Sequence, residues 1–382
     1  MKAFCLNNIS QVALNNLKNP DTTVADINDA DSILVRSAEM KEMELGANIL
    51  AVARAGAGVN NIPLEKYAKQ GVVVFNTPGA NANAVKELVL AAMLIASRDI
   101  IGGNNWVKEN AADENIAKTA EKAKKAFGGY EILGKKVAVI GLGAIGILVA
   151  NSCVALGMNV IGYDPYLSTA NALKLNSKVQ YTASLEDAVK DVDFVTIHVP
   201  AMDATKGMIN ADLIAKMNKN TIILNFSRDS LVKEDALAAA LEAGNIRKYV
   251  TDFANPKSVT MKNTIVLPHL GASTEEAEDN CAVMAVEELK DFIEHGNIKN
   301  SVNYPAINAG VKNGAARICI CHTNVPGVIN KFTKVISDTG ANINTLLSQS
   351  KGEFAYTILD TDKSVAADAF NGLEGVIRVR VI

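Results

Sequence analysis

Short apolar runs, separated by turn residues and helix-length segments, mark the first hundred residues of the chain. They predict strands over Ala3–Leu6, Ile33–Val35, Leu50–Ala53 and Val72–Phe75. Apolar strands that alternate with helical segments are typical of βαβ units and a parallel sheet. A helix predicted over Ala84–Arg98 is apolar nearly all round, which indicates a helix buried between domains.

The pattern changes after this helix. Residues 102–130 are polar and rich in Lys and Ala, which predicts a helical crossover with a glycine hinge at its end. A second α/β region begins at Lys135, and a helix over Ala282–His295 is expected to return to the first domain. The segments predict four parts: a flavodoxin-like first domain over 1–98 and 283–300, a second domain over 99–282, a linker over 301–314 and a module over 315–382.

The C-terminal module has its own order of elements, β-α-β-β-α-β, which is typical of the ferredoxin-like fold. The predicted elements are strand Arg317–Cys321, helix Gly327–Thr339, strand Ile343–Ser350, strand Phe354–Asp360, helix Ala366–Leu373 and strand Ile377–Val381. Cys319 and Cys321 alternate along the first strand, so we expect them to share one face as small core residues rather than bind a metal.

One glycine-rich turn stands between a strand and a helix. An apolar strand precedes Gly141, Gly143 and Gly146, and a helix predicted over Ile145–Leu156 follows. In dinucleotide-binding folds such glycines allow a tight turn, close approach of a pyrophosphate, and packing of helix on strand. Asp164 ends the next strand, where a carboxylate accepts hydrogen bonds from ribose hydroxyls and repels a 2′-phosphate. The turn predicts NAD, held by Gly141, Gly143, Ala144, Ile145, Gly146 and Asp164.

Polar residues follow several strands of this second region. Arg228, Asp252 and His269 each come directly after or near the end of an apolar run. Because the carboxyl ends of parallel strands meet at one edge, we expect these side chains beside the cofactor. Taken singly, Arg228 could form a surface ion pair with Asp229, and His269 could be structural; their joint placement favours a site. The expected cofactor contacts here are His198, Val199, Pro200, Phe226, Ser227, Arg228, Asp252, His269, Gly271 and Ala272.

Composition narrows the class of protein. The chain has 382 residues, enough for two or three domains, and a net charge of −3, which gives no reason to expect nucleic acid or an anionic membrane as a partner. The five cysteines are scattered, so we expect neither a disulfide framework nor a metal site. We expect a cytoplasmic protein, because neither a secretory signal nor a membrane-spanning run is evident.

The chain resembles the NAD-dependent D-2-hydroxyacid dehydrogenases over nearly its whole length. The glycine loop, the turn that bears Arg228 and the stretch Pro268–Thr274 match the family's cofactor and catalytic segments. The chain is most similar to the short serine-pathway members, which oxidise 3-phospho-D-glycerate to 3-phosphooxypyruvate. Segments Leu34–Ser37, Arg54–Asn61 and Asn76–Asn81 match the substrate pocket. The resemblance implies substrate contacts from Arg36, Ser37, Arg54, Gly56, Ala57, Gly58 and Asn81.

The resemblance also implies roles and shows two departures. Arg228 would bind the substrate carboxylate and polarise the forming carbonyl, while His269 would take the hydroxyl proton. Asp229 stands where the family has glycine, so it could partly screen Arg228. Asn255 stands where a glutamate pairs with the catalytic histidine. An amide can orient an imidazole without stabilising its positive charge, so we expect activity with an altered pH–rate profile.

The C-terminal module resembles an ACT domain, a small amino-acid-sensing fold. In serine-sensing members, His322, Asn324 and Asn342 would bind the effector between paired modules, which implies L-serine regulation and a homodimer or homotetramer. A module that only dimerises is the alternative. For the whole chain, another D-2-hydroxyacid substrate and a dinucleotide-sensing protein without turnover also stay open. The predicted fold is α/β: two Rossmann-like doubly wound parallel-sheet domains plus a C-terminal ferredoxin-like (ACT) α+β module.

Overall fold

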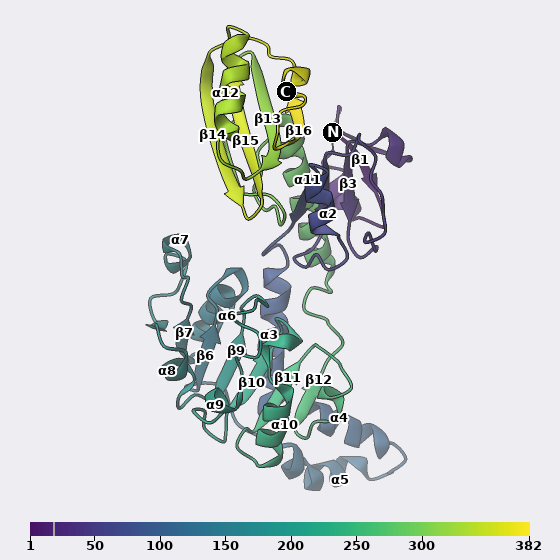
Figure 1. Cartoon of the computed structure of the whole chain (residues 1–382). Coiled ribbons are helices and arrows are strands. Elements are labelled where there is room, and N and C mark those ends of the chain that lie inside the picture. Colours follow the sequence, from purple (N-terminus) through teal and green to yellow (C-terminus); the bar gives the residue numbers. More distant parts are fainter. Residues whose placement is uncertain (18–19) are drawn as a thin grey trace. The chain divides into compact units, whose positions relative to one another are not determined.

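The computed structural model describes residues 1–17 and 20–382 and divides into two compact units (Figure 1). Unit 1 comprises Met1–Asn81 and Glu275–Ile382, and unit 2 comprises Ala82–Thr274. The helix α3 (Ala82–Ser97) therefore groups with the glycine-loop region, whereas the whole of α11 (Glu275–His295) groups with the first sheet. The sequence pattern predicts the first of these helices over Ala84–Arg98 and the second over Ala282–His295.

Unit 1 contains a five-stranded parallel sheet with the order β2-β1-β3-β4-β5. This is the flavodoxin-like order, in which ligands bind outside the carboxyl ends of the strands. Polar, exposed β2 at the sheet edge was not predicted, because a short edge strand has no apolar alternation to reveal it. The strands are β1 (Lys2–Cys5), β2 (Thr22–Val24), β3 (Ser32–Val35), β4 (Ala51–Arg54) and β5 (Val73–Asn76).

Both faces of this sheet are covered, since successive strand residues point to opposite sides. One face, with Leu34 and Phe75, packs on Leu289 and Phe292 of α11. The opposite face forms a second core around Tyr67, whose helix α2 follows β4. The smaller helical elements of this part are α1 (Gln11–Leu14), η1 (Ile27–Asp29) and α2 (Leu64–Lys69).

The C-terminal module adds a four-stranded antiparallel sheet of order β14-β15-β13-β16 to unit 1. One face packs under α12, around Phe332 and Phe370. Cys319 and Cys321 lie on the other face, in the same core as α11 and the first sheet. The elements are β13 (Ala316–Thr323), α12 (Val328–Asp338), β14 (Ile343–Lys351), β15 (Phe354–Thr361), η5 (Ala367–Phe370) and β16 (Val376–Val381).

Buried polar contacts fasten this module to the rest of unit 1. Arg317, which is fully buried, pairs with Asp360 at 2.6 Å and also donates to the carbonyl of His295 at the end of α11. Arg380 donates to the carbonyl of Ile293 at 3.1 Å, and its guanidinium lies 4.4 Å from the ring centre of Phe292. Cations at a helix C-terminus are stabilised by the carbonyl dipoles.

Unit 2 contains a seven-stranded parallel sheet of order β12-β11-β10-β9-β6-β7-β8, which reverses between β6 and β9. Such a reversal is the switch point where dinucleotides bind in doubly wound sheets. The strands are β6 (Lys136–Ile140), β7 (Asn159–Tyr163), β8 (Gln180–Thr182), β9 (Phe194–Ile197), β10 (Ile222–Asn225), β11 (Lys248–Thr251) and β12 (Thr264–Val266).

Helices cover both faces of this sheet, so the predicted doubly wound α/β class is confirmed. One core contains residues of α3 and α6, and the other contains residues of α8, α9 and α10. Besides α3, the helical elements are α4 (Ile100–Glu109), α5 (Ile116–Ala123), η2 (Lys124–Phe127), α6 (Ala144–Ala155), α7 (Thr169–Ala172), α8 (Leu185–Val189), α9 (Ala211–Ile214), η3 (Asp229–Leu231), α10 (Glu234–Glu242) and η4 (Ser258–Thr260).

Two predicted helices differ in extent. The helix predicted from Ala282 begins at Glu275. Its first turn is acidic, and acidic side chains stabilise the N-terminus of a helix. The second helix of the module shrinks to the 3₁₀ turn η5, which ends shortly before Gly372, a residue with φ of 75°.

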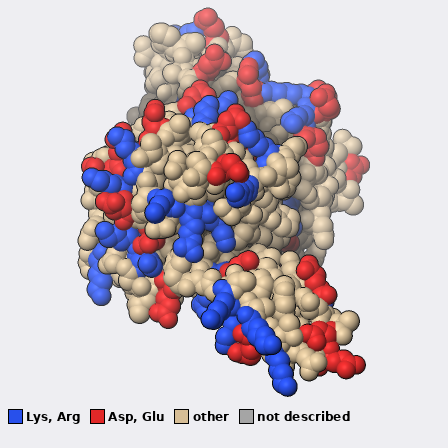
Figure 2. All heavy atoms as spheres, turned by 90° about the horizontal axis from the view of Figure 1, so that it is seen from below, with Lys and Arg blue, Asp and Glu red and all other residues tan. Residues whose placement is uncertain are grey.

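Surface charge is mixed. Figure 2 shows Lys and Arg interspersed with Asp and Glu over the face that it presents. Among the helices in residues 1–17 and 20–382, none has the length and apolarity needed to cross a membrane.

Candidate active site

The glycine loop joins β6 to α6 in unit 2. A side chain at Gly141 would lie 2.5 Å from the carbonyl oxygen of His198, and one at Gly146 would lie 1.8 Å from the carbonyl oxygen of Gly141. These two glycines are therefore required by the protein's own packing. A side chain at Gly143 would meet no described atom within 4 Å. Its Cβ would occupy open space at the N-terminus of α6, where a pyrophosphate would bind.

Asp164 follows β7 and faces the same loop. Its Oδ2 accepts from the backbone N–H of Leu142 at 2.9 Å, and its Oδ1 accepts from Tyr166 N–H at 2.8 Å. Each carboxylate oxygen keeps a lone pair, so the group still has capacity to accept from ribose hydroxyls. The donor set and the open space at Gly143 fit an NAD molecule.

His198 lies next to this loop, and its imidazole is neutral at pH 7. Burial lowers the pKa of its imidazole to about 3. Its Nε2 lies 2.9 Å from Thr196 Oγ1, and its backbone N–H extends the ladder to Ile140. These contacts favour the predicted role of His198 as a lining residue that acts through its backbone.

Arg228 lies just beyond β10, in a turn held by side chains. Asn225 Nδ2 donates to the carbonyl of Arg228 at 2.9 Å, and Ser227 Oγ donates to Ile197 O at 2.7 Å. The guanidinium donates to Ser227 O at 2.6 Å, whereas Asp229 accepts from Ser230 N–H. In the described part of the chain no ion pair joins Arg228 to Asp229, so the expected screening finds no support in this geometry.

Asp252 follows β11 and contacts the loop that carries His269. The side chain is 1% exposed, and its Oδ2 accepts from Gly271 N–H at 3.0 Å. Burial raises the pKa of Asp252, while the Gly271 N–H and the charges of His269 and Arg228 oppose that rise. The structure thus brings Arg228, Asp252 and His269 into one electrostatic neighbourhood. The Oδ1 of Asp252 is buried and has no hydrogen-bond partner among the described residues, so it can accept from a donor such as a carboxamide.

His269 and Asn255 are not brought together in the expected way. The exposed His269 lies beside Phe253, with ring centres 5.0 Å apart and ring planes tilted by 56°. Asn255 instead donates to Glu234 Oε1 at 2.7 Å and accepts from Ser258 N–H at 2.8 Å within its own turn. The charge of His269 acts instead on the pKa of Asp252, which lies three residues before the position that the family pattern indicated.

The predicted substrate residues lie in unit 1, in loops after three adjacent strands. Arg36 and Ser37 follow β3, Arg54 ends β4, and the loop that ends at Asn81 follows β5. The guanidinium of Arg54 lies over Gly56, where a side chain would come within 2.5 Å of Nη1. Gly56, Ala57 and Gly58 continue this loop, and Asn76 Nδ2 donates to the carbonyl of Ala57 at 2.6 Å.

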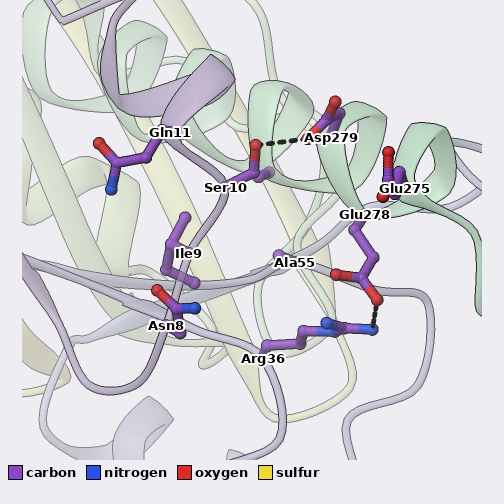
Figure 3. A pocket seen from close by; sticks show the side chains of 10 residues that line it. Asn8, Ile9, Ser10, Gln11, Arg36, Ala55, Glu275, Glu278 and Asp279 are labelled. Atoms are coloured by element: carbon purple, nitrogen blue, oxygen red, sulfur yellow. Dashed lines mark hydrogen bonds and ion pairs between the residues drawn. The ribbon is translucent and has the colours of Figure 1, made fainter.

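A cavity of about 310 Å³ opens beside Arg36 (Figure 3). Besides Arg36, it is lined by Ser10 of the loop after β1 and by Glu275, Glu278 and Asp279 of α11. Sequence reasoning missed these acids because it started α11 at residue 282. The signal that could have found them is the run of acids after Thr274, which is typical of a helix N-terminus.

A second cavity, of about 340 Å³, lies in the module of unit 1 and includes His322, Asn324 and Ser348. His322 is 1% exposed and both ring nitrogens are engaged: Nδ1 with Thr323 O at 2.9 Å and Nε2 with Thr357 Oγ1 at 2.8 Å. Burial lowers its pKa, which favours a neutral ring. Asn342 does not line this cavity; its backbone N–H donates to Asp362.

No group of three or more His, Cys, Asp or Glu in residues 1–17 and 20–382 is arranged to hold a metal ion. All five cysteines are free thiols.

Comparison with known proteins shows the family of the chain. Residues 90–271 match the NAD binding domain of the D-isomer specific 2-hydroxyacid dehydrogenases. A D-3-phosphoglycerate dehydrogenase of Haemophilus influenzae is 30% identical over 360 residues, covering 91% of this chain and 84% of the relative. One from Methanocaldococcus jannaschii is 37% identical over 290 residues, or 74% of this chain. The chain spans only 53% of that archaeal relative and 54% of the one from Mycobacterium bovis.

Solved structures share the fold. An NADPH-dependent glyoxylate/hydroxypyruvate reductase from Sinorhizobium meliloti has a TM-score of 0.65 at 21% identity, covering 79% of this chain and 97% of its own. An NAD⁺-bound 3-phosphoglycerate dehydrogenase from Entamoeba histolytica has a TM-score of 0.60 at 24% identity, covering 79% and 98%. The chain therefore belongs to the D-isomer specific 2-hydroxyacid dehydrogenase family and is an NAD-dependent oxidoreductase.

Proposed function

We propose that the chain oxidises 3-phospho-D-glycerate to 3-phosphooxypyruvate, the entry step to L-serine. Bound NAD supplies the hydride acceptor for the substrate carbon that bears the hydroxyl. Arg228 holds the substrate carboxylate in a fork of N–H donors, and the imidazole of His269 takes the hydroxyl proton. Arg36 and Arg54 supply cations for the anionic ends of the substrate, with Ser37 and Asn81 as further donors.

The observation that carries this proposal is the shared neighbourhood of Arg228, Asp252 and His269 beyond the ends of β10, β11 and β12. A fixed cation and an imidazole suit a 2-hydroxy acid, because its carboxylate needs pairing and its hydroxyl needs a base. The choice of a phosphorylated substrate is supported by the names of the relatives from Haemophilus influenzae and Methanocaldococcus jannaschii.

The test measures NADH formation from 3-phospho-D-glycerate, D-glycerate and D-lactate, each with NAD. A carbonyl trap such as hydrazine is included, because oxidation of these alcohols by NAD is uphill. We expect the highest kcat/KM with 3-phospho-D-glycerate and loss of turnover in His269→Asn. A higher kcat/KM with another acid would identify a different substrate, and NAD binding without turnover of any acid would indicate a dinucleotide-sensing protein.

We also propose that the module cavity binds L-serine and lowers activity. Its support is the polar lining: Asn324, Ser348 and Ser350 offer amide and hydroxyl groups to an ammonium and a carboxylate. Serine titrated against initial rate tests this in the full chain. Asn324→Ala should weaken inhibition, whereas Asn342→Ala, outside the cavity, should leave it nearly unchanged; no inhibition of the unsubstituted chain would refute the proposal. Light scattering will test the expected homodimer or homotetramer.

A further inference from the structure

Arg36 already holds an anion that belongs to the chain itself. Its Nη2 donates to Glu278 Oε1 at 2.6 Å, and the two side chains are 39% and 42% exposed. Figure 3 shows Glu278 reaching from α11 to the guanidinium across one side of the cavity. A pair that stays in contact with solvent can open at low cost, because water solvates both separated charges.

Hydrogen bonds within unit 1 hold the backbone on both sides of the Arg36–Glu278 pair. Arg36 follows the fully buried strand β3, and its backbone N–H donates to Asn7 Oδ1 at 2.9 Å. On the other side, Asp279 accepts from Ser10 Oγ at 2.5 Å, which holds the first turn of α11 beside the loop after β1. This hydrogen bond holds the start of α11 close to the loop after β1, so Glu278 stays within contact distance of Arg36.

Negative side chains outnumber positive ones around the cavity, which disfavours an anionic ligand. One guanidinium, that of Arg36, lines the cavity together with three carboxylates, those of Glu275, Glu278 and Asp279. A phosphate that pairs with Nη2 of Arg36 competes with the carboxylate of Glu278, which already accepts from that nitrogen and repels a second anion beside it. A substrate without a second anionic group makes no such demand.

We propose that Glu278 is a specificity-determining residue, whose carboxylate competes with the phosphate end of the substrate for Arg36. The inference rests on the proposed function, in which Arg36 binds an anionic end of 3-phospho-D-glycerate. The competition lowers the preference of the enzyme for phosphorylated over unphosphorylated D-2-hydroxy acids. It also gives Arg36 an anionic partner when the product leaves.

The experiment compares Glu278→Gln with Glu276→Gln, which removes the same charge from the same helical turn but lies outside the cavity. Initial rates are measured with 3-phospho-D-glycerate and with D-glycerate. In Glu278→Gln the ratio of the two kcat/KM values should rise about three- to fivefold, the fold-change expected for losing a half-exposed ion pair. Glu276→Gln should leave the ratio unchanged.

A double substitution tests the assignment to Arg36. In an Arg36→Gln background, Glu278→Gln should have no effect on the ratio, because the contested donor is gone. The inference is overturned if Glu278→Gln lowers the ratio or leaves it unchanged, if Glu276→Gln gives the same rise, or if the rise persists without Arg36.

Failure of the proposed function would be visible separately. If the unsubstituted chain oxidises neither acid, that function is wrong, and calorimetric titration with inorganic phosphate then decides the inference. Tighter phosphate binding by Glu278→Gln than by the unsubstituted chain would uphold the competition, and equal binding would refute it.

Discussion

Gly143 precedes α6 as its N-cap and Gly146 lies in its first turn, and the two are glycines for different reasons. At Gly146 a Cβ would collide with the backbone of Gly141, whereas at Gly143 it would point into open space. Gly146→Ala should therefore destabilise unit 2 by about 3 kcal/mol. Gly143→Ala should leave the melting temperature unchanged and weaken NAD binding by about tenfold or more, as lost close contact with the pyrophosphate implies.

Thermal melts and calorimetric NAD titrations of the two variants measure both effects. The opposite pattern, with Gly143→Ala unstable and NAD affinity retained, would contradict the assignment of the pyrophosphate to this loop.

At the residue scale, Asp252 and Asn255 make distinct predictions for turnover. Under the proposed function, Asp252 holds the loop that carries His269, because its Oδ2 accepts from Gly271 N–H at 3.0 Å. Asp252→Asn removes the negative charge that interacts with His269 and Arg228, so kcat should fall. Asn255→Ala should leave kcat nearly unchanged, because its amide contacts Glu234 and its own turn.

Initial rates of both variants decide between these positions. A loss of turnover in Asn255→Ala and not in Asp252→Asn would restore the orienting role that the family pattern assigns to Asn255.

At the element scale, α11 contains a carboxyl group that the proposed chemistry does not use. Glu288 is 5% exposed and accepts from Asn300 Nδ2, and burial raises its pKa from 4.5 to about 7. Between these two pH values the folded state keeps a proton that the unfolded chain releases, so stability falls as pH rises through that window. Glu288→Gln mimics the protonated form and should stabilise unit 1 by about 2–3 kcal/mol at pH 8.

Melting temperatures at pH 5 and pH 8 check this prediction. The variant and the unsubstituted chain should melt nearly together at the lower pH and separate at the higher pH. An equal difference at both values would show that Glu288 does not titrate in the folded state.

The elements also show what the sequence could predict. Strongly apolar strands such as Ile222–Asn225 are buried on both faces, so their runs of apolar residues were sufficient to find them. The short polar edge strands Thr22–Val24 and Gln180–Thr182 carry no such pattern. The start of α11 at Glu275 was missed for the same reason, since its first turn is polar and its apolar stripe begins later.

The candidate site, too, could be predicted from the sequence only in part. Motif glycines and the residues at strand ends could be located, because parallel topology brings those ends to one edge. The pairing of side chains could not: nothing in the sequence says that Arg36 meets Glu278 or that Asn255 turns to Glu234. Such contacts depend on segments far apart in the chain, whose approach is decided by packing.

At the scale of the molecule, the two units have separate cores. The cores around β6–β12 contain residues of unit 2, whereas Cys319 and Tyr356 of the module share a core with Phe75 and Phe292 of unit 1. We therefore expect two calorimetric transitions, one of which includes the module. NAD at about one hundred times its Kd should stabilise only the unit 2 transition, by about 2.7 kcal/mol.

Differential scanning calorimetry with and without NAD measures this. A separate third transition for the module, or an equal NAD shift in both transitions, would contradict the division. Gly143→Ala provides a control: with about tenfold weaker binding at the same NAD concentration, it should keep both transitions and show an NAD stabilisation of only about 1.4 kcal/mol.

The split composition of unit 1 also determines the order in which the chain can fold on the ribosome. Residues 82–274 form unit 2 without a break, so that unit can fold as soon as it has emerged. The first sheet is made earlier, yet the helix that covers one of its faces begins only at Glu275. Nearly two hundred residues must be synthesised before this apolar face is covered, and during that interval it is the part of the nascent chain most in need of a chaperone.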